Sequence, residues 1–436
     1  MSKFLESTTE PDVMAGPGVQ RDITRRSVVK APKGLADDCD VLPSVVTSAP
    51  QGHLEVGRVN TWTEFQALES EWRALEARLP ALPFVSFDWN AAWWQHMREH
   101  KLTLVDKLAV RTFRSPSGEL RAVAPLMLTR RPGVGPMRFR QMQFFGADPN
   151  MTEIRGIAVP DNLRQQVYLA LLDHLHLESD TWDSFDLAGL ASSTIIAGAV
   201  EQQFPGTSWR SDLPDYYLNL PPTWCEFKSG LSRNIKESLR KCYNAPRRDG
   251  VTFSLAVVRA TSEVTEGVEA FLHLHQSRAE RSETIRHNNV FATECTRHFL
   301  RDVCHRFAAR DALRIFQLKI AGQVAATRIG FVHGDALYLY YSGYSQAYAR
   351  YSIMTTLVAE IIKYAIGEGF HSVNLSTGTD VSKQRWTPAL KVYRNATLVS
   401  PSLRARLTSR TYRATRSAIK RWPAALRMCG LLSRRT

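Results

Sequence analysis

The chain has 436 residues and a mass of 49.2 kDa, more than one hydrophobic core usually serves, so two domains are expected. Hydrophobic residues make up 44% and charged residues 22%, with a mean hydropathy of -0.25, which excludes collagen-like, coiled-coil and wholly disordered proteins. No run approaches the roughly 18 apolar residues of a membrane span, and the N-terminus lacks the apolar core of a secretory signal. We therefore expect a cytoplasmic protein.

The net charge of +14 is concentrated in a C-terminal tail. Residues 401–436 contain nine Arg, one Lys and no acid, so the rest of the chain is nearly neutral. Arginines that recur among apolar residues favour a basic amphipathic helix that contacts an anionic membrane peripherally through residues 402–436. Nonspecific RNA binding and a disordered, solubilising tail are the alternatives. We do not expect the body of the protein to bind nucleic acid.

The six cysteines lie far apart and form no CxxC pair, so neither a disulfide framework nor a zinc site is indicated. Cys295 and Cys304 lie in a segment with helical spacing, and we expect both thiols to be buried on one amphipathic helix. No metal cofactor is expected.

Residues 1–50 are rich in Pro, Gly, Ser and Thr and are predicted to be a disordered leader. A helix is predicted over 61–80, with Thr61 or Thr63 as its N-cap. Around it we predict, in chain order, a strand at 53–59, a helix at 86–100, strands at 102–113, 120–131 and 137–146, a helix at 162–178 and a strand at 182–190. This order is that of an α/β unit.

The proline-rich segment 213–224 is predicted to be the transition to a second domain. It is followed by a basic helix at 231–250, a strand at 251–258, helices at 268–282 and 291–311, antiparallel strands at 313–322, 323–334 and 336–345, a helix at 353–369 and a strand at 371–378. The similar plan of the two halves suggests an internal duplication. We divide the chain into a leader (1–50), two domains (51–225 and 226–400) and a tail (401–436).

Several segments together resemble a known family. They are EWRAL, PFVSFDWNAAWW and APLML in the first half and FLHLHQSR, LKIAGQVAATRIGF, YLYYSGYSQAYARYS and NLSTGTDVSKQRW in the second. In this order they resemble the cellulose-biosynthesis-like acetyltransferases, a double-GNAT group related to the Fem aminoacyl transferases, over roughly 330 residues. The resemblance implies an α/β (α+β) fold of two tandem GNAT-like domains, each a mixed, mostly antiparallel sheet flanked by helices. It also implies acetyl-CoA, or another acyl-CoA, as co-substrate.

A GNAT enzyme holds pantetheine between two diverging central strands and the pyrophosphate at the start of the next helix, where the helix dipole favours negative charge. That helix is predicted to begin near Ser352, which makes Ser352 the N-cap and Arg350 the cation of the clamp. The candidate cofactor-binding residues are Tyr348, Arg350, Tyr351 and Ser352. Relatives commonly carry Pro-Gly where Ile353 and Met354 stand, and an ordinary capped helix is the alternative.

Tyr341 and Tyr344 are candidate acids, because a phenol can return a proton to a departing thiolate and a tyrosine near this position does so in several GNAT enzymes. Strand alternation predicts that Tyr338 and Tyr340 lie on one face and Tyr341 on the other. Packing in the core is the alternative for each tyrosine.

His275 and Arg278 are three residues apart and are predicted to share a helix face. The resemblance makes them a pocket-lining pair, in which His275 serves as a base and Arg278 grips a carboxylate or phosphate of the substrate. A solvent-exposed pair is the alternative.

Gly378, Lys383 and Trp386 match a G...K..W arrangement of the relatives. The resemblance implies that Lys383 holds a phosphate or the reacting carbonyl, where an ammonium would stabilise an oxyanion. Asp380 is predicted to orient Lys383 or to act as a base, and Trp386 to contact the substrate. A solvated loop with a tryptophan lid is the alternative.

These residues lead to the hypothesis of an acyl-CoA-dependent N- or O-acyltransferase that attacks the thioester directly. The expected acceptor is a sugar, amino sugar or similar small molecule of envelope or exopolysaccharide metabolism. A Fem-like aminoacyl transferase and a noncatalytic accessory protein of a membrane polysaccharide synthase are the alternatives. We expect the ligand site between the halves, beside the segment from Trp89 to Trp94, whose tryptophans are themselves expected in the core.

Overall fold

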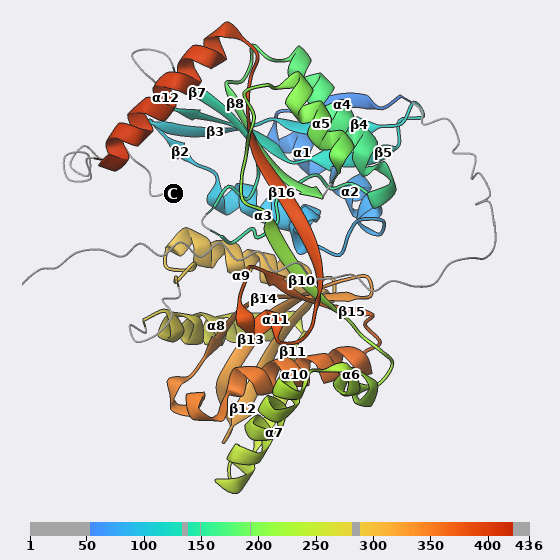
Figure 1. Ribbon diagram of the computed structural model, residues 1–436, viewed down its shortest axis with the longest axis vertical. Coiled ribbons are helices and arrows are strands. Elements are labelled where there is room, and N and C mark those ends of the chain that lie inside the picture. Colours follow the sequence, from blue (N-terminus) through green and yellow to red (C-terminus); the bar gives the residue numbers. More distant parts are fainter. Residues whose placement is uncertain (1–52, 133–137, 149, 192, 281–287, 422–436) are drawn as a thin grey trace, which may run out of the picture. The chain divides into compact units, whose positions relative to one another are not determined.

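The computed structural model describes residues 53–132, 138–148, 150–191, 193–280 and 288–421 (Figure 1). The predicted leader and the part of the predicted tail beyond residue 421 lie outside these ranges. The described residues belong to one compact unit.

The first half follows the predicted order. Its helices are α1 (Trp62–Ala67), α2 (Glu69–Glu76), α3 (Phe87–Met97), α4 (Arg164–Leu177) and α5 (Thr194–Gln203). Its strands are β1 (Glu55–Val59), β2 (His100–Lys101), β3 (Leu104–Leu108), β4 (Val110–Arg114), β5 (Leu120–Ala124), β6 (Leu126–Arg131), β7 (Phe139–Phe144), β8 (Ser184–Ala191) and β9 (Ser208–Trp209). Thr61 caps α1 in a capping box with Glu64, as predicted, but the single helix predicted over 61–80 is interrupted at Leu68.

Two of the predicted strands are each divided between two sheets. The segment predicted at 102–113 changes sheet at Ala109, and the segment predicted at 120–131 changes sheet at Pro125. Strands β4 and β5 form a three-stranded sheet with β1, whereas β3 and β6 join the large sheet. Pro125 has no N–H to donate to a ladder, which suits it to the position between two sheets.

The second half also follows the predicted order. Its helices are α6 (Trp224–Gly230), α7 (Arg233–Arg248), α8 (Val264–Ala279), α9 (Glu294–Ala308), α10 (Ile353–Gly367), α11 (Val381–Gln384) and α12 (Leu403–Arg421). Its strands are β10 (Leu213–Asn219), β11 (Phe253–Val258), β12 (Leu313–Ile320), β13 (Gln323–His333), β14 (Ala336–Tyr344), β15 (Ser372–Thr377) and β16 (Ala389–Val399). Short 3-10 turns are η1 (Pro83–Val85), η2 (Asp161–Leu163), η3 (Thr261–Glu263) and η4 (Gln346–Tyr351).

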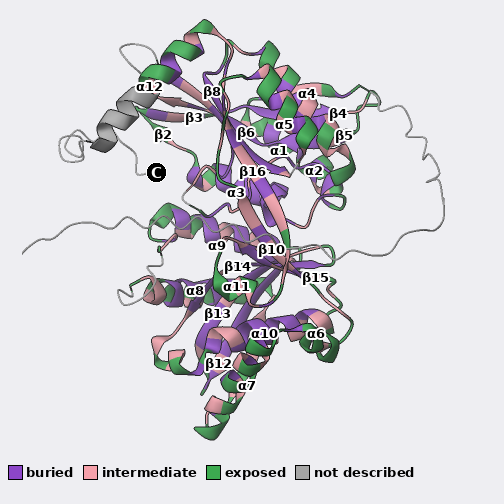
Figure 2. Ribbon diagram, viewed as in Figure 1, coloured by how far each residue is buried: buried purple, intermediate pink, exposed green. Residues whose placement is uncertain are grey.

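Helices cover both faces of the sheet in the second half, and the strands β12, β13 and β14 are buried along most of their length (Figure 2). Alternation along β12 sends Ile315 into the core shared with α8 and α9, and Phe316 into the core shared with α7 and α10. Cys304 of α9 is buried as predicted, but Cys295 is exposed because it lies in the first turn of that helix.

The proline-rich segment predicted as a transition is largely a strand of the sheet. β10 pairs antiparallel with both β15 and β16, and β16 continues the sheet by pairing antiparallel with β8 of the first half (Figure 1). One 13-stranded sheet therefore runs through both halves. The prediction of a transition from these prolines was wrong. Pro214 lacks an N–H and so cannot donate to a ladder, but this is only one donor, and other residues of β10 are paired with strands on both sides.

The predicted tail is helical as far as Arg421. Helix α12 packs against β7 and β16, where the ring of Tyr412 stacks on that of Phe139 with centroids 4.2 Å apart. Arg404 pairs with the buried Asp183 at 3.0 Å. Among the described helices, none combines the length and the apolar character that a bilayer crossing demands.

The two halves repeat one plan, in which three antiparallel strands are followed by a helix and a parallel strand. In each half the parallel pair is joined over a short ladder, from Gln141 to Gln143 between β7 and β8 and from Ala336 to Tyr338 between β14 and β15. Beyond these ladders the strands diverge. The resulting gap is closed by the chain itself in the first half, where a Cβ on Gly189 would lie 2.0 Å from the carbonyl oxygen of Arg155.

This close approach predicts the cost of two substitutions. Gly189 and Gly250 both have a φ of +70°, but a Cβ on Gly250 would meet nothing within 4 Å. Gly250→Ala should lower the free energy of unfolding by about 1 kcal/mol through backbone strain alone. Gly189→Ala adds a clash with the backbone and should lower the free energy of unfolding by about 3 kcal/mol or more. Denaturant titrations of the two variants would measure the difference, and equal costs would contradict the close approach.

Candidate active site

The candidate site lies where β14 and β15 diverge. On its other side β14 pairs with β13, and between Arg328 and Gly330 the register shifts because β14 carries an extra residue there. Such a β-bulge takes backbone groups out of the ladder and re-aims side chains. The backbone from Leu339 to Tyr341 is therefore only partly engaged in the sheet, at the level where β15 has already separated.

The bulge overturns the prediction that Tyr341 lies opposite Tyr338 and Tyr340. All three phenols reach the same segment of the first half. Tyr338 donates to the carboxylate of Glu153, Tyr340 to the carbonyl of Met151 at 2.6 Å and Tyr341 to the carbonyl of Asn150 at 2.7 Å. Strict alternation fails because the extra residue lets two successive side chains, Tyr340 and Tyr341, turn to one side.

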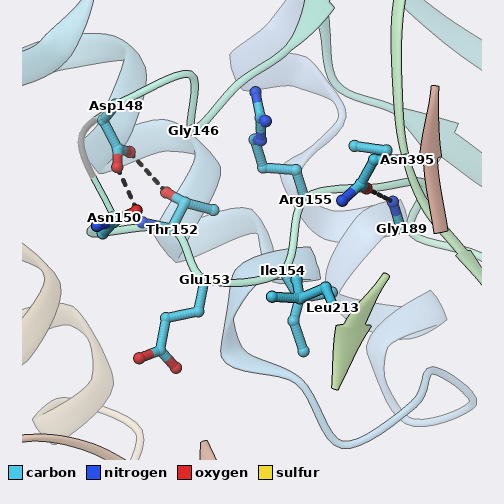
Figure 3. Close-up of a pocket in the computed structure, with 11 residues that line it drawn as sticks. Gly146, Asp148, Asn150, Thr152, Glu153, Ile154, Arg155, Gly189, Leu213 and Asn395 are labelled. Carbon is cyan, nitrogen blue, oxygen red and sulfur yellow. Dashed lines mark hydrogen bonds between the residues drawn. The ribbon is translucent and has the colours of Figure 1, made fainter. Parts of the chain in front are cut away.

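Helix α3 holds the segment that the tyrosines contact. The indole N–H of Trp93 donates to the carboxylate of Asp148 at 2.8 Å, and that of Trp89 donates to the hydroxyl of Thr152 at 3.1 Å. Asp148 in turn accepts from the Met151 amide at 2.6 Å and from the Thr152 hydroxyl at 2.9 Å (Figure 3). The tryptophans are thus core residues, as expected, and their N–H groups fix the turn that presents Glu153.

Glu153 extends away from Arg155 and the rest of this turn (Figure 3). Its carboxylate accepts hydrogen bonds from the Tyr338 hydroxyl of β14 and, at 2.8 Å, from the Ser376 hydroxyl of β15. Burial raises the pKa of the Glu153 carboxyl above its ordinary value, and the Tyr338 hydrogen bond and the Lys383 charge oppose this. Glu153 therefore joins the two diverging strands and is suited to accept a proton.

A second buried carboxyl, Asp215 of β10, lies behind β15. One of its oxygens accepts from the Asn374 side chain at 2.9 Å, while the other has no hydrogen-bond partner among the described residues. Burial raises the pKa of Asp215 to about 6. The Asn374 carboxamide oxygen accepts from the Ser376 amide at 2.6 Å, and Ser376 has a φ of +76°. This chain from Asp215 to Ser376 fixes the hydroxyl that contacts Glu153.

Arg328 of β13 spans the gap between the diverging strands. Its guanidinium donates to the carbonyl of Tyr340 at 3.2 Å on β14 and to that of Leu375 at 3.3 Å on β15. Burial lowers the pKa of Arg328 to about 10, against the opposing charge of Glu153. An arginine that binds backbone carbonyls keeps its positive charge unneutralised, so it contributes a positive potential to the site.

Lys383 and Asp380 lie together at the end of β15. The Lys383 ammonium donates to the Thr377 carbonyl and lies 3.4 Å from the exposed Asp380 carboxylate. Burial lowers the pKa of Lys383, while the charge of Glu153 opposes this. A Cβ on Gly378, whose φ is +109°, would lie 3.5 Å from the ammonium, so the turn brings Lys383 back over β15. Trp386 is in the hydrophobic core and 3% exposed.

Helix α8 brings His275 and Arg278 to the end of β14 on one face, as predicted. The imidazole Nδ1 of His275 lies 3.1 Å from the Ser342 carbonyl oxygen, and Arg278 donates to the Ser342 hydroxyl at 3.0 Å. The Arg278 guanidinium also lies over the ring of Tyr344, 5.7 Å from its centroid. Helix α8 can approach β14 this closely because Gly343 has no Cβ. A Cβ at this position would lie 2.5 Å from the His275 amide nitrogen.

The predicted clamp residues lie in η4 and at the start of α10. Arg350 is exposed and its guanidinium lies 2.5 Å from the Tyr351 hydroxyl, which donates to Asp249 at 3.0 Å. Tyr348 packs partly buried against the core. Ser352 immediately precedes α10 with a φ of +53°, and its side chain makes no capping hydrogen bond within the described chain. These residues lie at the end of β14, apart from the contacts between Glu153 and the strands.

The corresponding gap of the first half is a small polar cavity of about 130 Å³. Its walls include Arg155, Gly189 and Asn395, and Asn395 accepts from the Gly189 amide at 3.1 Å (Figure 3). The Tyr168 hydroxyl also lies 3.3 Å from the carbonyl oxygens of Ala188 and Gly189. A cavity of this size is below the roughly 300 Å³ of small-molecule sites, and the backbone of β8 is already satisfied.

Sequence reasoning missed Glu153, Asp215 and Arg328. The first lies in an irregular segment, the second in a segment interpreted as a transition and the third in the middle of a strand. The one available signal was the single acid in the strand LPDYYLN. Within the described residues, no group of three or more His, Cys, Asp or Glu has the arrangement of a metal site.

Comparison with known proteins finds a recognised domain in the part of the chain that contains β14 and β15. Residues 231–384 match the model of a family described as an acetyltransferase (GNAT) domain. A crystal structure of FemX aligns with a TM-score of 0.50 and 10% identity over 75% of this chain and 95% of that chain. A protein of unknown function from Bacteroides thetaiotaomicron VPI-5482 aligns with a TM-score of 0.47 and 10% identity, over 79% of this chain and 100% of that chain. No curated protein sequence matches.

A tandem GNAT protein from the clavulanic acid biosynthesis pathway aligns with a TM-score of 0.39 and 10% identity, over 80% of this chain and 99% of that one. The fold class predicted from the sequence is confirmed: the chain is a mixed α/β protein with mostly antiparallel strands flanked by helices, and its fold is similar to that of FemX. The narrower resemblance to the cellulose-biosynthesis-like group stays a prediction.

The raised pKa of Asp215 predicts a pH dependence of stability. The folded-state pKa of about 6 exceeds the ordinary value of 3.8, so the folded protein holds a proton that the unfolded chain releases. The contribution of this group to stability is therefore fully present below about pH 4 and falls, by about 3 kcal/mol in all, as the pH rises through 6. Asp215→Asn should remove this fall. Urea titrations of both proteins at about pH 4 and pH 8 test it, and identical pH dependences would contradict the assignment.

Proposed function

We propose that this protein is an acyl-CoA-dependent acyltransferase whose donor binds between β14 and β15 and whose acceptor approaches over Glu153. The observation that carries the proposal is the contrast between the two parallel strand pairs. In the first half Arg155 and Asn395 fill the gap, whereas in the second half side chains of opposite charge gather beside a bulged strand. The match of residues 231–384 to a GNAT domain supports the choice of the second half.

The proposed reaction is direct attack on the thioester. The acceptor nitrogen or oxygen forms a bond to the acyl carbon, the carbon–sulfur bond breaks and the acceptor proton passes to the carboxylate of Glu153. Tyr341 or Tyr344 returns a proton to the departing thiolate. Arg328 and Lys383 supply positive charge where the oxyanion develops, and their partial burial strengthens this effect. His275 and Arg278 line the end of the donor groove, and Asp380 orients Lys383.

The proposed acyl group is acetyl, and the proposed acceptor is a sugar, amino sugar or similar small molecule of envelope or exopolysaccharide metabolism. Support for a polar acceptor comes from the seam between the halves, where Glu153, Ser376 and Asp380 provide hydrogen-bonding groups. Peripheral membrane contact through residues 402–436 is part of this proposal, and the exposed Arg406 and Arg410 of α12 are consistent with it.

A Fem-like transfer from an aminoacyl-tRNA is the second candidate. The observation that favours it is the exposed basic face of α7, which carries Arg240, Lys241, Arg247 and Arg248. This helix packs against η4 and α10, and the Asp249 carboxylate after it accepts from Tyr351. A polyanionic carrier could therefore contact α7 while its acyl end enters the groove.

Glu153→Gln tests the first candidate. Because the amide cannot take the acceptor proton, kcat should fall by about 100-fold or more, while affinity for acetyl-CoA stays within about twofold of wild type. The wild-type rate should rise with pH through the raised pKa of Glu153, since the carboxylate is the active form. Thiol release with a panel of amino sugars and calorimetry with acetyl-CoA provide the two measurements.

Glu266→Gln is the matched control, because Glu266 is exposed on α8 outside the site. A Glu153→Gln protein that keeps more than about half of the wild-type kcat would contradict the base assignment. A wild-type protein that fails to bind acetyl-CoA at millimolar concentration would contradict the proposal that acetyl-CoA is the acyl donor.

The second candidate has its own test. Arg240→Ala/Lys241→Ala removes two exposed charges from α7, so tRNA affinity in a gel shift should fall by about tenfold if this face binds the carrier. Acetyl-CoA affinity should stay unchanged in the same variant. Wild-type protein that does not retard tRNA at low salt would remove this candidate.

A further inference from the structure

A second and larger cavity lies in the first half, at the place where β3 leaves the large sheet and continues as β4. Its volume is about 630 Å³, within the range of small-molecule sites. Its walls come from the ends of β1 and α3, the starts of α1 and β4, and the segment after α4. None of its lining residues belongs to the candidate active site, so the acyltransferase proposal leaves this cavity unexplained.

The lining is strongly basic. Arg58, Arg98, Lys107 and Arg111 all contribute to it, and the one acid in the lining is Glu178. Glu178 is buried and already neutralised, since it pairs with Arg58 and with Arg111 at 2.6 Å. Although burial opposes it, hydrogen bonding by His174 and the charge of Arg111 lower the pKa of Glu178 to about 2. Glu178 thus stays ionised, and Arg58 and Arg111 balance its charge.

Two of the cations remain uncompensated. Arg98 and Lys107 are exposed, and neither forms an ion pair within the part of the chain that the structure describes. The Arg98 guanidinium lies over the ring of Trp94, 5.7 Å from its centroid. Arg111 is buried, with only 5% of its side chain exposed, and its Nε has no hydrogen-bond partner among the described residues. Arg111 therefore brings a buried guanidinium with an unsatisfied N–H to the lining of the cavity.

Apolar side chains share the lining with these charged groups. Trp62 and Trp94 line the cavity together with Leu108, Leu128 and Met142. Trp62 is half-buried and stacks one face on Phe65, with ring centroids 5.1 Å apart. A lining of aromatic and aliphatic side chains with a small number of charged groups is the usual arrangement for a ligand that has both a ring and an anionic group.

We propose that this cavity binds a small phosphorylated molecule that carries a ring, with its phosphate facing Arg98, Lys107 and Arg111 and its ring against Trp62 and Trp94. A nucleotide and a sugar phosphate both have this chemistry. The site is separate from the donor groove between β14 and β15, so its occupation does not depend on the acyltransferase reaction.

Calorimetry on the full chain with three probes tests this inference. Uridine diphosphate represents the nucleotide, glucose 1-phosphate the sugar phosphate and inorganic pyrophosphate the anion without a ring. Uridine is chosen because adenine is part of coenzyme A and would report on the other groove. At low salt we expect at least one ring-bearing probe to bind with a Kd below about 1 mM, and pyrophosphate to bind at least about fivefold more weakly than it.

The variant Arg98→Ala/Lys107→Ala removes the two uncompensated cations, and its binding of that probe should be weakened by about tenfold or more. Arg78→Ala/Lys228→Ala, which removes two exposed charges outside every proposed site, is the matched control and should bind like wild type. Circular dichroism and acetyl-CoA titration of the same proteins report on folding and on the donor groove separately.

Three results would overturn the inference. They are wild-type protein that binds neither ring-bearing probe at several millimolar, an Arg98→Ala/Lys107→Ala protein that binds as tightly as wild type, and a control that loses as much affinity as the cavity variant. Pyrophosphate that binds as tightly as the best ring-bearing probe would overturn the role of the tryptophans. Because the acetyl-CoA titration is read independently, failure here is distinguishable from failure of the proposed function.

Discussion

The contact between the turn around Asn150 and the diverging strands β14 and β15 is the constraint on which the site depends. Three phenols of β14 donate to this turn, and Glu153 joins β14 to β15 through Tyr338 and Ser376. Hydrogen bonds to a carboxylate are stronger than those between neutral groups, and here they are shielded from water. The turn therefore fixes the first half against the strands that would hold a thioester, and it brings the carboxylate with it.

The two halves have the same order of elements, but different groups lie in the gap between the two parallel strands of each half. In the first half the strand gap is occupied by the chain near Arg155, which passes Gly189 so closely that only glycine fits. In the second half no backbone crosses the gap in the described residues, and Arg328 bridges it with a side chain. A side chain can move aside for a ligand at the cost of a few hydrogen bonds, whereas a backbone segment cannot. This difference is the reason why we propose the donor groove in the second half, with the first half as its opposite wall.

Buried carboxyls have opposite pKa shifts at the two sites because their partners differ. Near β15 it raises the pKa of Glu153 and Asp215, because these carboxyls have few charged partners. In the first half Glu178 is also buried, but His174 and two arginines keep it ionised. A buried glutamate thus has a raised pKa at one place, where we propose it as the base, and is a fixed counter-ion at the other.

The sequence by itself determined the order of elements, the similar plan of the halves and the helix face shared by His275 and Arg278, because periodicity and spacing are local properties of the chain. It could not show that Tyr341 joins Tyr338 and Tyr340 on one side, since the bulge that turns them depends on the register with β13. It also missed Glu153 and Asp215, because their partners Tyr338 and Asn374 lie 185 and 159 residues away in the chain. Only the tertiary structure decides such sites, because the pKa and the reach of a carboxyl depend on neighbours that are remote in the chain.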